Sequence, residues 1–246
     1  MKTGMTIAVL GATGMVGSRV INEAGARGHQ VIALSRKPAG EDPGNPNVTP
    51  VAVDANDSHA VREALAGSAS PCAADAVVLT VRTMPVDQEF LVGTTRTVLG
   101  IAARLGIPVL VIGGAGALRS PDDRDLLVAD NPAYVPADIR AVAVAGVAQL
   151  RACQSHADAD CVYLSPPALL EPGVRTGRYR RGTDTLLVSA DGRSWISAED
   201  LAVAVVDELE TPGPDHHITV VHQGEPPSAS AGQGAGRRSH PVRARS

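Results

Sequence analysis

Short apolar segments alternate with segments of helical periodicity along most of this chain. The apolar segments are residues 6–10, 30–35, 48–54, 75–81, 108–114 and 161–166. Helical patterns lie between them at residues 14–27, 57–67, 86–105 and 137–157. Strands that are apolar nearly throughout are buried on both faces, as in a parallel sheet that helices cover from both sides. The alternation therefore predicts an α/β protein with a doubly wound parallel sheet, the Rossmann arrangement.

The last third of the chain departs from this alternation and predicts a small C-terminal subregion within the same domain. Residues 171–184 are polar and are expected to form a loop. Asp191 and Gly192 separate two strand-like runs, which predicts a hairpin over residues 185–197. This subregion is expected to border the substrate.

A capping box predicts where the last helix begins. Ser197 has the position to cap that helix, and Asp200 has the spacing to reach back to it. A final strand is expected at 216–222, so that residues 1–222 form a single domain. Residues 223–246 contain four arginines, one glutamate and almost no aliphatic side chain, which predicts a disordered basic tail.

Composition narrows the possible partners and the compartment. A net charge of −4 over 246 residues gives no reason to expect nucleic acid as a partner. No apolar run approaches the roughly 18 residues of a membrane span, and no signal peptide is recognisable. Cys72, Cys153 and Cys161 lack metal-ligand spacing, and no metal site is expected. A cytoplasmic monomer or homodimer that acts on a small molecule is the expectation.

Three glycines follow the first apolar run directly. Gly11 suits the tight turn that leaves the strand, Gly14 leaves room for a pyrophosphate, and Gly17 lets the helix pack closely. The N-terminus of the helix then offers free N–H groups to phosphates. Met15 and Val16 begin that helix and join the candidate binding residues. The segment predicts a dinucleotide site.

The end of the second strand distinguishes between two nicotinamide cofactors. NAD sites place Asp or Glu there for the ribose hydroxyls, whereas NADP sites place basic groups there for the additional phosphate. This chain has Ser35, Arg36 and Lys37. The guanidinium of Arg36 can hold a phosphate in a forked geometry. The expected cofactor is therefore NADPH rather than NADH.

Several motifs together resemble the atypical short-chain dehydrogenase/reductases, the branch with NmrA-like and biliverdin/flavin reductase B-like members. The motifs are "GATGMVGSRV", "SRKP", "VDAND", "VLVIGGAGAL", "YLSPPALLEPGVRTGRY" and "GRSWISAEDLAVAVVDELE". The resemblance covers about residues 5–222. The glycine motif is shared by a whole superfamily, whereas the combination of the last two motifs is more specific to this branch.

The resemblance implies further cofactor-binding positions. Thr13 would contact phosphate, and Asp54 would lie by the adenine. Three strand ends would complete the site: Thr80, Val81 and Arg82 by the ribose and pyrophosphate, Gly113 and Gly114 by the nicotinamide, and Pro166 and Pro167 as the wall behind that ring. Ligands of open α/β sheets do bind at the carboxyl ends of the strands.

The catalytic residues are harder to identify. Most short-chain dehydrogenases use Tyr-x-x-x-Lys, but the only lysines here are Lys2 and Lys37, and no such pair exists. Gly116 and Ala168 stand where relatives carry a hydroxyl residue and, in some, a histidine. Tyr134 is the remaining candidate proton donor, with pocket lining as its alternative role. Other polar candidates are Arg119, Ser165 and Tyr179, and Arg175, Arg178, Arg180 and Arg181 either attract an acidic substrate or form a solvated loop.

These residues favour an NADPH-dependent oxidoreductase that transfers a hydride to a small conjugated acceptor of the flavin, quinone or carbonyl type. The missing Tyr-x-x-x-Lys pair leaves an alternative, a non-catalytic NAD(P) sensor of the NmrA-like kind. A third reading is an NAD(P)-dependent epimerase or dehydratase.

Overall fold

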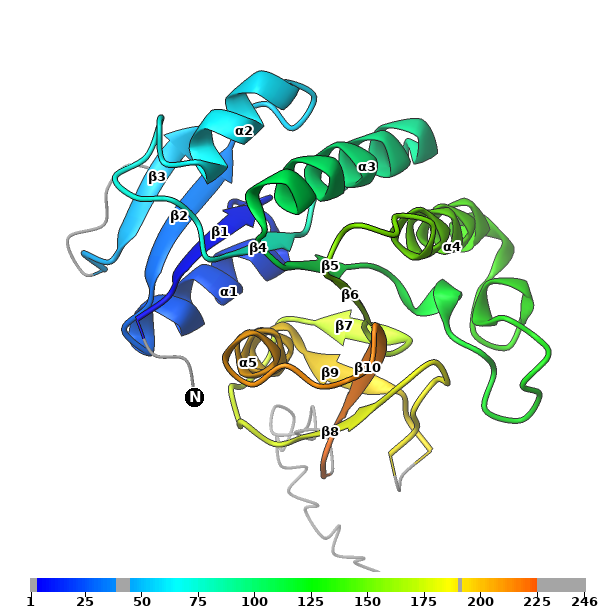
Figure 1. The fold of residues 1–246 in the computed structure, drawn as a ribbon. Coiled ribbons are helices and arrows are strands. Elements are labelled where there is room, and N and C mark those ends of the chain that lie inside the picture. Colours follow the sequence, from blue (N-terminus) through cyan, green and yellow to red (C-terminus); the bar gives the residue numbers. More distant parts are fainter. Residues whose placement is uncertain (1–3, 39–44, 190–191, 225–246) are drawn as a thin grey trace, which may run out of the picture.

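The computed structural model describes residues 4–38, 45–189 and 192–224. Figure 1 shows a central sheet with helices on both faces. The strands are β1 Thr6–Leu10, β2 Gln30–Ser35, β3 Val48–Ala52, β4 Ala76–Leu79, β5 Val109–Ile112, β6 Cys161–Ser165, β7 Leu169–Glu171, β8 Tyr179–Gly182, β9 Trp195–Ser197 and β10 His217–His222. The α-helices are α1 Met15–Ala26, α2 Ser58–Leu65, α3 Gln88–Leu105, α4 Arg140–Gln154 and α5 Ala198–Glu210. Short 3-10 turns are η1 Ala115–Ala117, η2 Val128–Asp130 and η3 Ala137–Ile139.

The main sheet has the doubly wound order that the sequence predicts. Its strands lie in the order β3-β2-β1-β4-β5-β6-β10-β8, and all pairs are parallel except the edge pair of β10 with β8. The chain winds outward from β1 in one direction and then from β4 in the other. The reversal between β1 and β4 is the point at which such sheets bind ligands.

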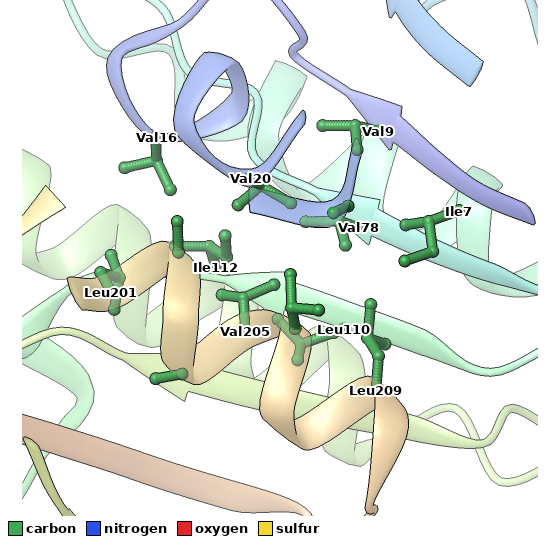
Figure 2. Close-up of a cluster of buried hydrophobic side chains, with 14 of the residues drawn as sticks. Ile7, Val9, Val16, Val20, Val78, Leu110, Ile112, Leu201, Val205 and Leu209 are labelled. Atoms are coloured by element: carbon green, nitrogen blue, oxygen red, sulfur yellow. The ribbon is translucent and has the colours of Figure 1, made fainter. Parts of the chain in front are cut away.

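Alternate residues of the strands enter two separate cores. Ile7 and Val9 of β1 pack with α1 and α5 on one face, where Val20 and Val205 lie close to them (Figure 2). Ala8 and Leu10 point to the other face, toward α2, α3 and α4. Each fully buried valine, leucine or isoleucine in these cores stabilises the fold by about 1.5–3 kcal/mol.

Two elements have bounds in the structure that differ from those expected from the sequence. The third strand ends at Ala52 rather than at residue 54, and Pro50 lies inside it, in register with Ala33. The edge position of β3 tolerates a proline because no further strand requires its missing N–H. The expected helix at 137–157 begins instead as η3 and becomes α4 at Arg140.

The expected loop and hairpin of the C-terminal subregion are partly wrong. The predicted loop at 171–184 contains β8, and its first residue ends β7. Within the predicted hairpin, the N–H of Ser189 donates to the carbonyl oxygen of Arg193 at 2.8 Å, so the chain does turn back there. β9 nevertheless pairs in parallel with β7, with Trp195 in register with Leu169. The expected tail lies outside the described residues from 225 onward.

Candidate dinucleotide-binding site

The glycine loop connects β1 with the ends of both neighbouring strands. Gly11 has φ +102°, a conformation that other residues rarely adopt, and a Cβ there would lie 2.6 Å from the carbonyl oxygen of Thr80. The N–H groups of Gly11 and Ala12 both donate to the carbonyl oxygen of Leu34 near the end of β2, at 3.1 and 3.2 Å. The loop is therefore held at the switch point between β1 and β4.

The start of α1 has the properties of an anion site. Gly14 precedes the helix without a side-chain cap, and no acidic residue lies in the first turn. A Cβ on Gly14 would meet only the oxygen of Gly11, at 3.2 Å. A Cβ on Gly17 would collide with that same oxygen, so Gly17 serves the fold of the loop itself rather than packing against the sheet. Uncapped N–H groups and the helix dipole favour a phosphate here.

The end of β2 combines one buried hydroxyl with two exposed cations. Ser35 is buried and its Oγ has no hydrogen-bond partner in the described residues, whereas Arg36 and Lys37 are exposed. The N–H of Val53 donates to the main-chain carbonyl oxygen of Ser35 at 2.9 Å, which places the following Asp54 beside this strand end. A buried hydroxyl without a partner among the described residues is free to bind a polar group of a ligand. These residues fit a phosphorylated nucleotide.

The ends of β4, β5 and β6 provide the remaining predicted residues. The N–H of Thr80 donates to Leu10 at 2.9 Å, and the N–H of Gly113 donates to Leu164 at 2.9 Å. The first bond joins the end of β4 to β1, and the second joins the end of β5 to β6. The other predicted residues there differ in exposure: Val81 is half-buried, Arg82 is exposed, and Pro166 and Pro167 are buried.

The two glycines after β5 have different surroundings. A Cβ on Gly113 would collide with the hydroxyl and ring of Tyr163, whereas nothing lies within 4 Å of a Cβ on Gly114. Tyr163 is fully buried, and its hydroxyl donates to the carbonyl oxygen of Gly146 at 2.9 Å. Gly113 is therefore needed for packing, and only Gly114 leaves open space at the end of β5.

No hydroxyl side chain fits at position 116. A Cβ on Gly116 already approaches the Cβ of Ala143 to 2.8 Å. Tyr134 is half-buried and packs against a small apolar cluster that includes Leu118 and Val135. Both roles considered for Tyr134, proton donor and pocket lining, stay predictions.

Ser165 and His217 form a polar pair that the sequence does not predict. Ser165 Oγ and His217 Nε2 are 3.0 Å apart, and Ser165 immediately precedes Pro166. Burial lowers the pKa of His217, and the carboxylate of Asp184 opposes that shift. The imidazole is therefore neutral at neutral pH. No sequence signal links residues 52 positions apart in the chain.

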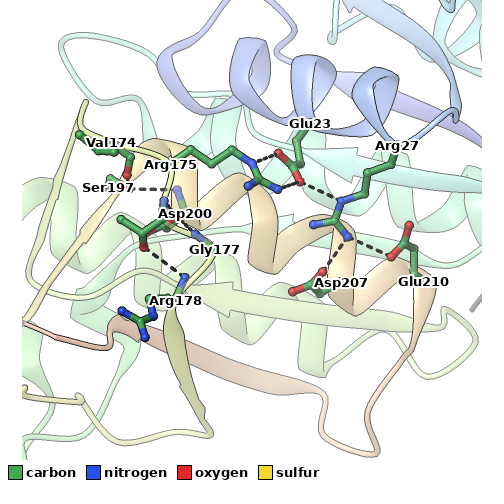
Figure 3. Close-up of polar contacts among 11 residues, drawn as sticks. Glu23, Arg27, Val174, Arg175, Gly177, Arg178, Ser197, Asp200, Asp207 and Glu210 are labelled. Carbon is green, nitrogen blue, oxygen red and sulfur yellow. Dashed lines mark hydrogen bonds and ion pairs between the residues drawn. The ribbon is translucent and has the colours of Figure 1, made fainter.

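Asp200 fixes the polar loop after β7, rather than closing the expected capping box (Figure 3). Ser197 caps α5 as expected, since its Oγ accepts from the N–H of Asp200 at 3.0 Å. The Asp200 carboxylate is fully buried and accepts instead from the N–H groups of Thr176 and Gly177, at 2.7 and 2.8 Å. The Thr176 hydroxyl also donates to it, at 2.6 Å. The carboxylate thus ties the loop to α5.

Two of the four loop arginines have ion-pair partners on helices. Arg175 binds Glu23 of α1 through two hydrogen bonds of 2.7 and 2.8 Å, visible in Figure 3. Arg175 and Arg27 lower the pKa of Glu23, although burial opposes them. Arg181 pairs with Glu208 and Asp215. These two arginines stabilise the loop, which reduces the charge left to attract a substrate.

The remaining polar candidates lie away from the strand ends or have partners already. The hydroxyl of Tyr179 donates to Asp207 of α5, and burial raises its pKa. Arg119 pairs with Asp184 at 3.2 Å. Within the described residues, no group of three His, Cys, Asp or Glu side chains could hold a metal ion, and no helix is long and apolar enough to cross a membrane.

Comparison with known proteins identifies the family. A family model described as NAD(P)H-binding matches residues 11–212. The uncharacterized protein YwnB of Bacillus subtilis is 33% identical over 224 residues, covering 90% of this chain and all of that protein. A structure of a putative exported protein from Burkholderia pseudomallei has a TM-score of 0.77 at 36% identity, over 89% of this chain and 100% of that chain.

Two further structures share the fold. One is a putative epimerase from Bacteroides thetaiotaomicron, with a TM-score of 0.78 at 31% identity, over 91% of this chain and 99% of that one. The other is a putative NADH-flavin reductase from Streptococcus pneumoniae, with a TM-score of 0.74 at 24% identity, over 89% and 100%. As its resemblance to atypical short-chain dehydrogenase/reductases implied, the chain belongs to the NAD(P)H-binding family.

Proposed function

We propose that this protein is an NADPH-dependent oxidoreductase that transfers a hydride to a small conjugated acceptor. The observation that carries the proposal is the end of β2. A buried hydroxyl without a partner, Ser35, stands there beside two exposed cations, Arg36 and Lys37. No acidic residue occupies the place at which NAD sites bind the ribose hydroxyls.

Each part of the site has a task in this proposal. NADPH supplies the hydride when it is bound. Gly11 provides the tight turn after β1, Gly14 leaves room for the pyrophosphate, and the N-terminus of α1 would present N–H groups and a partial positive charge to it. Arg36 would hold the additional phosphate through its guanidinium, with Lys37 as a second cation. The open side of Gly114 leaves room for the nicotinamide ring.

The type of acceptor follows from the proton chemistry at the strand ends. The Tyr163 hydroxyl is fully buried and donates to a helix carbonyl, and burial raises its pKa, so it is a poor proton donor. Gly116 has no room for a hydroxyl side chain. A flavin, a quinone or another conjugated acceptor can take its proton from water after hydride transfer. Such acceptors suit this site better than simple ketones.

One alternative is a protein that binds the cofactor and signals its redox state to a partner. The packing at Gly116 favours it, because the site lacks an obvious acid. An epimerase activity, suggested by the similar putative epimerase from Bacteroides thetaiotaomicron, ranks lower, because such reactions normally need an acid–base pair like the absent Tyr-x-x-x-Lys.

The test is NADPH oxidation with a panel of flavins, quinones and carbonyl compounds, alongside equilibrium binding of NADPH and NADH. Turnover with a conjugated acceptor and tighter binding of NADPH support the proposal. Tight binding of both redox forms without turnover supports the sensor. Gly14→Val is the control for the site, because its side chain would occupy the space left for pyrophosphate. That variant should fold and fail to bind NADPH, and unchanged affinity would refute the assignment of the loop.

A further inference from the structure

A cavity of about 440 Å³ lies beside α4, apart from every residue assigned to the dinucleotide. Its walls come from α4, from the segment 117–127, from Asp184 and from the start of β10 at His217. Pockets for small ligands typically measure roughly 300–1,000 Å³. The cavity is therefore large enough for a compact organic molecule.

The cavity has an apolar side and a polar side. Val147 and Leu150 of α4 contribute apolar surface, while Arg151 and Gln154 of the same helix contribute polar groups. His217 adds a half-buried imidazole whose Nε2 is engaged by Ser165. A ligand that fits this wall has an apolar body and a polar end.

The charges on the wall do not cancel. Arg119 has its partners within the protein, because Nε lies 3.2 Å from the Asp184 carboxylate and Nη1 donates to the carbonyl oxygen of Arg124 at 2.6 Å. Arg151 has no ion-pair or hydrogen-bond partner for its side chain among the described residues. Gln154 also has a free side-chain amide within that part of the chain. His217 adds no charge at neutral pH, because burial lowers its pKa.

The cavity adjoins the nicotinamide end of the predicted site. Ala117 on its wall belongs to η1, the turn that begins directly after Gly114. Val147 on its wall follows Gly146, whose Cβ position would lie 3.7 Å from the N–H nitrogen of Gly114. A molecule in the cavity would thus border the segment that leaves open space for the nicotinamide.

We propose that this cavity binds a compact organic anion, with its apolar body against α4 and its acidic group on Arg151. We further infer that the hydride acceptor belongs to this class, which rests on the proposed function. The binding claim can be tested without turnover, so the two claims can fail separately.

Two matched fluorescent probes test the binding claim. Anilinonaphthalenesulfonate and phenylnaphthylamine share their ring system, but only the first carries an anionic group. Both would be titrated with saturating NADP⁺, which keeps them out of the dinucleotide site. The expected result is one-to-one binding of the sulfonate at higher affinity than the neutral probe.

Arg151→Gln removes the proposed cation while keeping a good helix former on an exposed position. The variant should weaken binding of the sulfonate probe by roughly five- to tenfold and leave the affinity for the neutral probe unchanged. Arg62→Gln is the matched control, since Arg62 is exposed on α2, beside the opposite edge of the sheet (Figure 1). Equal binding of the two probes, or an equal effect of both variants, would overturn the cavity assignment.

A second pair of molecules tests the acceptor class. Naphthoquinone sulfonate and unsubstituted naphthoquinone differ intrinsically in reactivity, so the comparison is between variants rather than between quinones. Arg151→Gln should raise KM for the sulfonate by roughly five- to tenfold without changing KM for the neutral quinone. Equal changes in both would overturn the acceptor class. If neither quinone nor any other acceptor is reduced while the sulfonate probe still binds, the proposed function fails and the cavity assignment stands.

Discussion

The hydroxyl of Tyr163 occupies the space that a Cβ on Gly113 would need, so only glycine fits at this position directly after β5. Gly114 has no such neighbour. Two identical substitutions at adjacent positions therefore have different consequences. Gly113→Ala should lower the free energy of unfolding by about 1–3 kcal/mol, the usual cost of overpacking a core. Gly114→Ala should change it by less than about 0.5 kcal/mol.

Urea denaturation of the two variants measures this difference in the free energy of unfolding. NADPH titration then compares their affinities for the cofactor. If the nicotinamide lies against Gly114, a methyl group there should weaken NADPH binding in a fully folded protein. Equal losses of stability in the two variants would show that Tyr163 moves aside without cost.

Arg36 should determine the preference between the two nicotinamide cofactors. Arg36→Gln removes a charge-assisted pair with the additional phosphate, a loss of about 1.5–3 kcal/mol, or roughly ten- to a hundredfold in affinity for NADPH. Affinity for NADH should stay within about twofold. Calorimetric titration with both cofactors measures the ratio, and an equal loss for both would show that Arg36 does not contact that phosphate.

The stability contributed by Glu23 should depend on pH. Arg175 and Arg27 hold its pKa below the ordinary value of 4.5 in the folded protein. The contribution is therefore complete above that value and is lost as the pH falls through the folded-state pKa. Glu23→Gln should cost about 1–3 kcal/mol at neutral pH, because Glu23 is only 6% exposed.

That difference between wild type and variant should shrink progressively as the pH is lowered below about 4.5. Glu63→Gln, at an exposed pair with His59 on α2, should change stability little at any pH. A pH-independent cost of Glu23→Gln would mean that the glutamate acts through packing and not through its charge.

Asp200 should control the order of the loop that it fixes. Asp200→Ala removes the acceptor for the N–H groups of Thr176 and Gly177, whereas α5 keeps its cap from Ser197. Hydrogen exchange at those two amides should accelerate strongly, with smaller changes in the body of α5. Unchanged exchange would mean that the loop is held by other contacts, such as Arg175 with Glu23.

The sequence predicted the features that depend on neighbouring residues. The glycine loop, the apolar strands and the Ser197 cap arise from short-range patterns, and the structure has each of them. The doubly wound parallel sheet followed from the alternation of strands and helices, because parallel strands need crossover helices. Two cores of aliphatic side chains are likewise what strands apolar on both faces require.

Long-range relationships were not predictable from local patterns. Asp200 had the spacing of a capping box, but the loop at Thr176 and Gly177 takes its carboxylate. Ser189 and Arg193 are hydrogen-bonded across the predicted hairpin, but β9, which follows, pairs in parallel with β7 rather than with the run before it. Position 116 was identified as a departure from the family, and only the contact with Ala143 explains it. In each case a distant segment decides the outcome.

The most direct test of the account is a single-turnover experiment with NADPH that carries deuterium on the nicotinamide carbon that donates hydride. Enzyme loaded with this NADPH would be mixed with a flavin or quinone acceptor, and the loss of nicotinamide absorbance followed. Oxidation should be faster than without enzyme, should slow with the deuterated cofactor, and should disappear in Gly14→Val. Tight binding of NADPH with no oxidation by any acceptor would contradict it and identify the protein as a sensor.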